Sequence, residues 1–170
     1  MKQLILGGAR SGKSRYAEEI AGKSGKKVIY IATATARDRE MRQRISLHQQ
    51  QRPAHWQLVE EPLNLAQVLH EHDQTGNCLL VDCLTLWLSN CLAAGDENRL
   101  RQQQLELLTR VVELKSELLL VSNEVGQGIV PMGELSRKFV DESGRLHQRL
   151  AQVCDRVVFI TAGLPQILKS

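Results

Sequence analysis

The stretch that decides the fold is Gly7-Gly8-Ala9-Arg10-Ser11-Gly12-Lys13-Ser14, a complete G-x-x-x-x-G-K-[ST] motif. The apolar segment 3–6 precedes it, and apolar residues at helical spacing follow it at positions 16, 17 and 20. A buried strand, a glycine-rich loop and a helix N-terminus, in that order, surround a phosphate with backbone N–H groups. The motif therefore predicts a nucleoside triphosphate site, in which Lys13 reaches the β- and γ-phosphates and Ser14 binds Mg²⁺.

Outside this motif the chain alternates short apolar runs with helical patterns. Strand-like runs lie at residues 3–6, 27–32, 56–59, 78–81, 118–121 and 157–160. Helical spacing fills most intervals, at 63–72, 84–94, 98–114 and 133–153. Continuous apolar runs suit parallel strands that are covered on both faces. We expect one domain over residues 1–170, an α/β fold of the P-loop NTPase type with a mostly parallel sheet and helices on both faces.

Composition narrows the class of protein. The 22 Lys and Arg against 19 Asp and Glu give a net charge of only +3, and the basic residues are scattered, which argues against nucleic acid as a partner. The four cysteines lack C-x-x-C spacing, as expected for buried thiols in a reducing compartment. No apolar run approaches the roughly 18 residues of a membrane span, and the first strand leaves no room for a signal peptide. We expect a cytoplasmic protein without stable membrane insertion.

A second candidate site residue is Asp82, which ends the apolar run 78–81. A carboxylate at the end of a strand is the Walker B pattern, which holds the Mg²⁺ of a bound nucleotide. The same residue could instead cap the helix predicted from Leu84. The phosphate-binding motif favours the metal interpretation, and the alternative stays open at this level.

The charged segment 37–52 contains His48. If it is a helix that Pro53 ends, Ile45 and His48 share a face, with Arg44 one turn before the histidine. A cation one turn away disfavours imidazolium and keeps the ring neutral, as a nucleophile requires. Spacing alone favours a simpler interpretation, a solvated helix whose histidine lies at the edge of the core.

The segment 121–131 passes from an apolar strand into a polar loop with glycines at 126 and 128. Such loops build sites at the carboxyl edge of a parallel sheet. Asn123 and Glu124 could therefore contact nucleotide or substrate, or they could only cap the loop.

Taken together, these stretches resemble one family, the adenosylcobinamide kinase/adenosylcobinamide-phosphate guanylyltransferases of cobalamin biosynthesis. The resemblance runs over essentially the whole chain. It rests on the motif 7–15 and on Ile31-Ala32-Thr33, Glu40-Met41-x-x-Arg44-Ile45-x-x-His48, Arg52-Pro53, Trp56, Glu60, Asp82-Cys83-Leu84-Thr85, Ser122-Asn123-Glu124-Val125-Gly126-x-Gly128-Ile129-Val130-Pro131, Arg137-x-Phe139-x-Asp141 and Gly163-Leu164-Pro165.

The resemblance implies a bifunctional enzyme. It would phosphorylate adenosylcobinamide with ATP or GTP, and then transfer GMP from GTP to adenosylcobinamide phosphate, releasing adenosylcobinamide-GDP and pyrophosphate. It implies a homotrimer with nucleotide sites near subunit boundaries, and it makes His48 the residue that carries covalent GMP. The implied nucleotide-binding residues are Gly7, Gly8, Ala9, Arg10, Ser11, Gly12, Lys13, Ser14, Thr33, Ala34, Thr35, Gln49, Gln50, Gln51, Arg52, Glu60 and Asp82.

One position departs from the family pattern. Where the family usually reads G-x-x-N-Q, this chain has Gly144-Arg145-Leu146-His147-Gln148. Two other classes of function also remain open. A P-loop kinase with one activity would leave His48 unused, and a regulatory nucleotide switch would bind GTP and turn over slowly.

Overall fold

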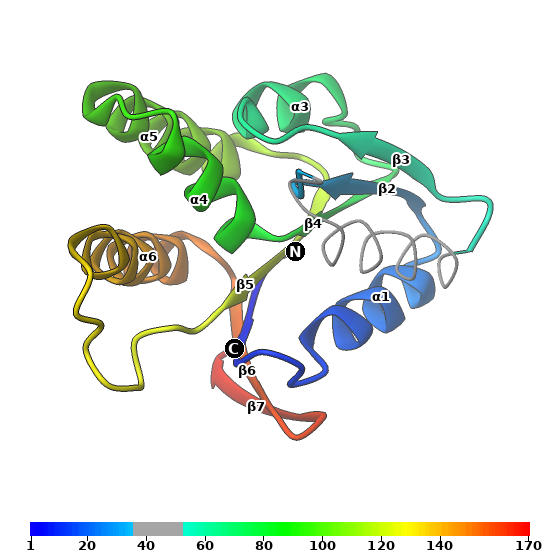
Figure 1. Cartoon of the computed structure of the whole chain (residues 1–170). Helices are drawn as coiled ribbons and strands as arrows, with labels where there is room; N and C mark the ends of the chain where they lie inside the picture. The colour runs from blue at the N-terminus through cyan, green and yellow to red at the C-terminus, as the bar shows by residue number, and fades with distance from the viewer. Residues whose placement is uncertain (36–52) are drawn as a thin grey trace.

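The computed structural model describes residues 1–35 and 53–170, and their strands form one sheet (Figure 1). The order across the sheet is β3-β2-β4-β5-β1-β6-β7. All neighbouring strands are parallel except β6 and β7. The strands are β1 (Lys2–Gly7), β2 (Lys27–Ala32), β3 (Gln57–Glu60), β4 (Asn77–Asp82), β5 (Glu117–Asn123), β6 (Arg156–Thr161) and β7 (Leu164–Lys169).

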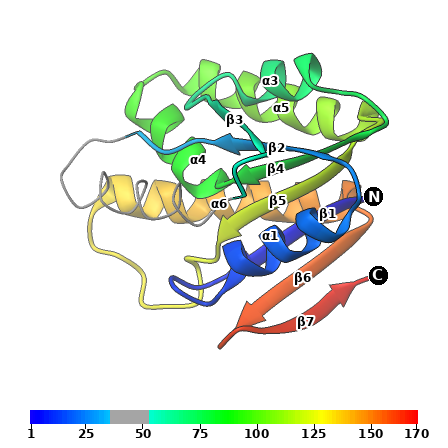
Figure 2. The same ribbon diagram turned by 90° about the vertical axis from the view of Figure 1, so that its right-hand side faces the viewer.

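Helices cover both faces of this sheet, which confirms the predicted α/β class. The described helices are α1 (Lys13–Lys23), α3 (Leu65–Glu71), α4 (Leu84–Ala93), α5 (Glu97–Glu113) and α6 (Glu134–Val153). Helix α1 packs on one face, and α3 to α6 pack on the other (Figures 1 and 2). Alternation along each strand divides the core in the same way. In β1, Leu4 and Leu6 face the four helices, whereas Ile5 faces α1.

Predicted and observed helix bounds differ at the start of α3. The predicted range 63–72 begins two residues before the helix. The N–H groups of Leu63 and Asn64 both donate to Glu61 Oε1, at 2.8 Å each. These two residues therefore form a turn around a carboxylate before the helix begins.

Strand β7 is absent from the sequence prediction, which ends the sheet at residue 160. It pairs antiparallel with β6 through a tight turn at Ala162 and Gly163, whose φ values are 52° and 79°. Two consecutive residues with positive φ are typical of a two-residue hairpin turn. The strand is exposed along its whole length and carries Pro165, so it lacks the continuous buried run of strands such as β1, β4 and β5.

The parallel strands all end at one edge of the sheet, where register brings the sequence motifs together. Ala32 of β2 lies opposite both Glu60 of β3 and Asp82 of β4. At the next pair of strands, Gly7 of β1 lies opposite Asn123 of β5. This carboxyl edge is where doubly wound sheets bind ligands. Among the helices of the described residues, none has the length and apolar character needed to cross a bilayer.

Candidate active site

The phosphate-binding motif forms a closed loop between β1 and α1. Arg10 and Gly12 adopt left-handed backbone conformations, with φ of 55° and 96°. The Ser11 N–H donates to the Gly8 carbonyl at 3.2 Å, which tightens the turn. Lys13 begins α1, is only 8% exposed, and donates from Nζ to the same Gly8 carbonyl at 3.1 Å. The loop, the lysine and the positive end of α1 thus surround the place where a phosphate would bind.

Two glycines of the loop are closely surrounded by neighbouring atoms. A Cβ on Gly7 would lie 2.5 Å from Ser11 Oγ and 2.6 Å from the Ile160 carbonyl oxygen. A Cβ on Gly12 would lie 3.2 Å from Gly163 Cα, in the hairpin turn between β6 and β7. The Gly163 N–H also donates to the Ser11 carbonyl at 2.8 Å. The hairpin that the sequence prediction missed therefore supports the loop from outside.

Burial and a nearby carboxylate have opposite effects on the pKa of Lys13. Burial lowers the pKa of Lys13 from its ordinary value, while Cys83 and Asp82 oppose that shift. Burial also raises the pKa of the Cys83 thiol to about 11, so the thiol is neutral at pH 7. Asp82 is therefore the negative charge that faces Lys13 across the end of the sheet. An incoming phosphate would add charge that favours the ammonium form.

Asp82 lies at the end of β4, and the capping alternative is not realised. Helix α4 has Cys83 at its N-cap and no side-chain cap hydrogen bond. Instead, Asp82 Oδ2 accepts a hydrogen bond of 3.0 Å from the Tyr30 hydroxyl, on the neighbouring strand β2. No pattern in the sequence indicates this tyrosine contact, because Tyr30 belongs to an apolar run. The contact holds one carboxylate oxygen and orients the other.

The donor set suits a magnesium–nucleotide complex better than a metal held by protein alone. Among the described residues, no group of three or more His, Cys, Asp or Glu side chains could hold an ion. Mg²⁺ bound with nucleotide usually takes one or two protein oxygens and completes its shell with phosphates and water. Asp82 and the half-buried Ser14 are donors of that kind, so the residues present fit the ion.

Two predicted nucleotide-binding residues after β2, Thr33 and Thr35, use their side chains to bind other parts of the protein. Thr33 is fully buried, and its hydroxyl donates to the Cys83 carbonyl at 2.7 Å and accepts from the Cys83 N–H at 2.9 Å. Asn90 of α4 donates to the Thr33 carbonyl at 2.9 Å, and the Thr35 hydroxyl donates to Asn90 Oδ1 at 3.2 Å. These bonds fix the ends of β2 and β4 beside each other. Asn90 was missed by sequence reasoning, since it lies within an apolar helix.

The remaining predicted residues divide into two groups. Glu60 is exposed at the end of the edge strand β3, where it lies opposite Ala32 of the neighbouring strand β2. His48 and the residues 49–52 lie outside the described part of the chain, so their assignments stay predictions.

A chain of polar side chains lies at the end of β5, beside the phosphate loop. His147 of α6 is 6% exposed, and its Nε2 lies 2.7 Å from Ser122 Oγ. Ser122 Oγ lies 3.2 Å from Thr85 Oγ1, which accepts from the Asn123 N–H at 2.6 Å. Beyond Asn123, the Glu124 N–H donates to the Gly7 carbonyl at 3.0 Å. The position that departs from the family pattern is thus joined to the phosphate loop.

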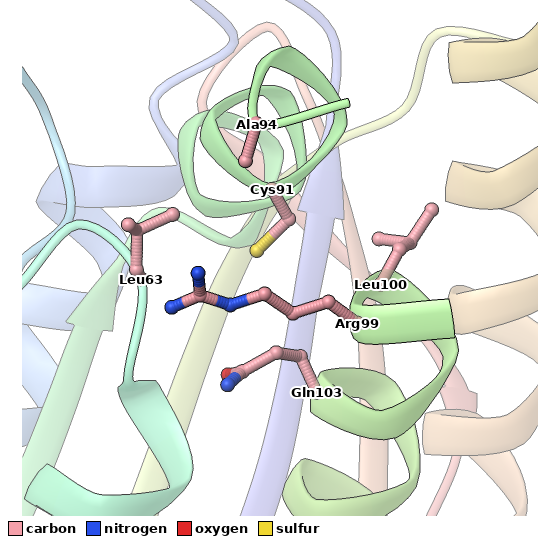
Figure 3. Close-up of a pocket in the computed structure, with 6 residues that line it drawn as sticks. All are labelled: Leu63, Cys91, Ala94, Arg99, Leu100 and Gln103. Carbon is pink, nitrogen blue, oxygen red and sulfur yellow. The ribbon is translucent and has the colours of Figure 1, made fainter. Parts of the chain in front are cut away.

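Two hollows lie away from the loop itself. One, between α4 and α5, holds only about 10 Å³, and the Arg99 side chain lies across it toward Leu63 and Cys91 (Figure 3). That volume is no more than a single water needs, so it is a packing gap. The other, of about 170 Å³, lies between the loop after β5 and the start of α6. Its rim includes Ile129, which is 98% exposed.

Two solved structures are similar to this fold. A Pyrococcus horikoshii OT3 protein matches with a TM-score of 0.61 at 11% identity, over 99% of this chain and 86% of that one. An ATPase from the type III secretion system of pathogenic bacteria matches with a TM-score of 0.56 at 15% identity, over 94% of this chain and 52% of that one. At these identities the similarity confirms the fold alone.

Sequence relatives are far closer. The bifunctional adenosylcobalamin biosynthesis protein CobP of Pseudomonas aeruginosa is 57% identical over 169 residues, covering 99% of this chain and 98% of the relative. The corresponding CobU proteins of Escherichia coli K12 and Salmonella typhimurium LT2 are 37% and 38% identical, covering 96% of this chain and 97% of each relative. The model of the cobinamide kinase/cobinamide phosphate guanyltransferase family matches residues 3–168. The chain therefore belongs to the cobinamide kinase/cobinamide phosphate guanyltransferase family.

Proposed function

We propose that this protein phosphorylates adenosylcobinamide with ATP or GTP, and then transfers GMP from GTP to the resulting phosphate. The observation that carries the proposal is the closed phosphate loop, with Lys13 donating to Gly8 and Asp82 facing it, in a chain that matches the family model over residues 3–168. Both reactions act on a nucleoside triphosphate, so both need this cradle. The products would be adenosylcobinamide-GDP and pyrophosphate.

In the kinase step the protein positions two reactants and stabilises charge. The loop N–H groups and Lys13 hold the triphosphate, and the alcohol oxygen of the substrate attacks the γ-phosphorus in line with the departing diphosphate. Phosphoryl transfer requires little covalent help from protein groups, because its transition state is loose and highly charged. Lys13 is aimed at that charge before the substrate binds, since its ammonium already occupies the loop.

Mg²⁺ is the implied cofactor, and Ser14 and Asp82 are the residues that would hold it. When bound, the ion neutralises phosphate charge and orients the triphosphate. Tyr30 restricts the Asp82 carboxylate to one orientation through its hydroxyl, and therefore prepares the free oxygen for an ion.

In the guanylyl step we assign the nucleophile to His48, on the strength of the matching sequence Arg44-Ile45-x-x-His48. A neutral imidazole nitrogen attacks the α-phosphorus of GTP, and pyrophosphate leaves. The phosphate oxygen of the substrate then displaces the histidine, so that one difficult transfer becomes two easier ones. Gln49, Gln50, Gln51, Arg52 and Glu60 are proposed to contact the nucleotide, together with the segment 33–35.

The same resemblance supports a homotrimer in the cytoplasm. Exposed apolar residues on the loop after β5 are consistent with a subunit contact, because Ile129 is 98% and Met132 is 96% exposed. Analytical ultracentrifugation of the purified protein tests the oligomeric state.

The experiment that tests the function uses GTP labelled at two positions. Incubation with Mg²⁺ and α-labelled GTP should leave label on the protein, while γ-labelled GTP should leave none. The adduct should be a phosphoramidate, stable in alkali and labile in acid, since protonation makes imidazole a good leaving group. His48→Asn should abolish labelling and guanylyl transfer while it retains most cobinamide phosphorylation. His70→Asn, an exposed position on α3, is the matched control and should label normally.

Other outcomes separate the rival functions. Label that persists in His48→Asn would move the nucleophile elsewhere. Phosphorylation of cobinamide without any protein labelling would favour a kinase with one activity. Tight GTP binding without turnover on cobinamide would favour a regulatory switch.

A further inference from the structure

We propose that His147 is a positioning residue for the transfer chemistry, and that it acts by holding the side chain of Glu124, whose backbone N–H donates to the first glycine of the phosphate loop. The inference rests on the proposed function for its kinetic consequences. Its structural part depends only on the contacts of the buried ring.

The ring connects two groups of different character. Its Nε2 lies 2.7 Å from Ser122 Oγ, a hydrogen-bond distance. Its Nδ1 lies 3.6 Å from Glu124 Oε2 and makes no hydrogen bond to any group of the described residues. Nδ1 is also shielded from solvent, so the carboxylate is the charge that it faces.

The chain of hydroxyls is compatible with either ring tautomer, and the Glu124 carboxylate discriminates between them. The Asn123 N–H donates to Thr85 Oγ1, and the Thr85 hydroxyl can then donate to Ser122 Oγ. In this direction of donation the Ser122 proton is available for His147 Nε2, and the ring proton is on Nδ1. If the ring proton were on Nε2 instead, the Nδ1 lone pair would point at the Glu124 carboxylate, and the two would repel each other. The field of Glu124 therefore favours Nδ1–H.

Glu124 transmits this contact to the phosphate loop. Its backbone N–H donates to the Gly7 carbonyl at 3.0 Å, and its Oε1 accepts from the Gly126 N–H at 2.5 Å. The carboxylate thus fixes the turn 124–126 at the junction between the phosphate loop and the loop that rims the larger hollow. A displacement of about 1 Å at such a junction can reduce a rate by up to a hundredfold.

The ring is neutral in this arrangement. Burial lowers the pKa of His147 below 6.5, and the nearby Glu124 carboxylate opposes that shift in part. Ser122 of β5, which contacts the ring, and Thr85 of α4, which contacts Ser122, carry no charge. Among the described residues, Glu124 is the charged group that acts on the ring.

Two amide substitutions separate the two sides of the ring. Asn places its amide near the position of Nδ1, whereas Gln reaches the position of Nε2. His147→Gln should keep the Ser122 bond, melt within about 2 °C of the wild type, and lose kcat about tenfold with the nucleotide KM nearly unchanged. His147→Asn should keep kcat within about threefold, yet melt about 3–5 °C lower. His70→Gln is the control and should change neither quantity.

Nitrogen NMR of histidine-labelled protein supplies a readout that does not depend on activity. The expected spectrum assigns one buried ring as the Nδ1–H tautomer, which shifts in Glu124→Gln and disappears in His147→Asn. A ring protonated at Nε2, or a His147→Gln variant with normal kcat, overturns the proposal. A wild-type protein with the Nδ1–H ring but no transferase activity would instead contradict the proposed function and leave the Glu124 contact standing.

Discussion

The phosphate loop and the end of β5 lie side by side at the carboxyl edge of the sheet, yet they are built in different ways. The loop comes from eight consecutive residues, 7–14, and its conformation follows from glycines and one lysine. The polar chain at β5 comes from three elements, with Thr85 on α4, Ser122 on β5 and His147 on α6. The Glu124 N–H, which donates to the Gly7 carbonyl, joins the two regions where β1 and β5 end.

This difference separates two kinds of functional information. The function of a consecutive motif can be recognised in the sequence, because the spacing of its residues alone decides which atoms meet. The network of Thr85, Ser122 and His147 can be recognised only in the folded structure, since residues 25 and 37 positions apart become hydrogen-bonded neighbours. The loop is expected to carry the larger energetic effects, and the network the smaller, adjusting ones.

The largest expected effect follows from removing the charge in the loop. Lys13→Ala should cost about 2–4 kcal/mol of transition-state stabilisation in both reactions, because each uses the same triphosphate cradle. Steady-state rates of cobinamide phosphorylation and of guanylyl transfer, each at saturating nucleotide, measure it. Lys23→Ala, at the exposed end of the same helix, serves as the control. Guanylyl transfer that survives in Lys13→Ala would mean that the second reaction uses another site.

A smaller effect is expected where the two regions meet. Gly7→Ala should lower the free energy of unfolding by about 1–3 kcal/mol, because its Cβ would meet the Ile160 carbonyl, a backbone atom that cannot move away. Gly8→Ala is the matched control, since no atom of the described residues lies within 4 Å of its added Cβ. Urea unfolding of the two variants tests the difference. Equal midpoints would show that β6 yields to the methyl group, and that the loop is less tightly enclosed than its geometry indicates.

Much of the fold could be predicted, because most of its strands are continuous apolar runs. Every predicted strand is present, and the helix bounds agree to within two residues at each end. Strand β7 is not predicted because it is exposed throughout, so its sequence lacks the continuous apolar run of a buried strand. Strand pairing at an edge, and a hairpin turn at Ala162 and Gly163, are what identify it.

Less of the candidate site could be predicted. The phosphate-binding motif predicts Lys13, and the apolar run that ends in a carboxylate predicts Asp82, but nothing in the sequence indicates that Tyr30 holds the carboxylate of Asp82. The threonine at position 33 was predicted to contact nucleotide, and the structure uses its hydroxyl to bind Cys83. These contacts depend on strand order, which brings the ends of β2 and β4 together across a sequence separation of 50 positions. The assignment of His48 stays a prediction, since it lies outside the described residues.

The smallest expected effect concerns the pH dependence of stability at the network. Because burial lowers the pKa of His147 below 6.5, the unfolded chain binds a proton at this ring before the folded protein does. The contribution of the neutral ring to the free energy of unfolding is therefore complete above pH 6.5. It is lost progressively as the pH falls below 6.5, until the pH passes below the pKa of the folded state.

Other groups also titrate in this range, so the useful quantity is a difference between two proteins. The free energy of unfolding of the wild type minus that of His147→Asn should be constant between pH 7 and 8 and should decrease below pH 6.5. Urea unfolding at matched ionic strength measures both curves, and His70→Gln should run parallel to the wild type because its ring is exposed. A difference that grows on acidification would mean that imidazolium pairs with Glu124 in the folded state. In that case the carboxylate, rather than burial, would control the ring, and the network at β5 would be a charged pair rather than a neutral one.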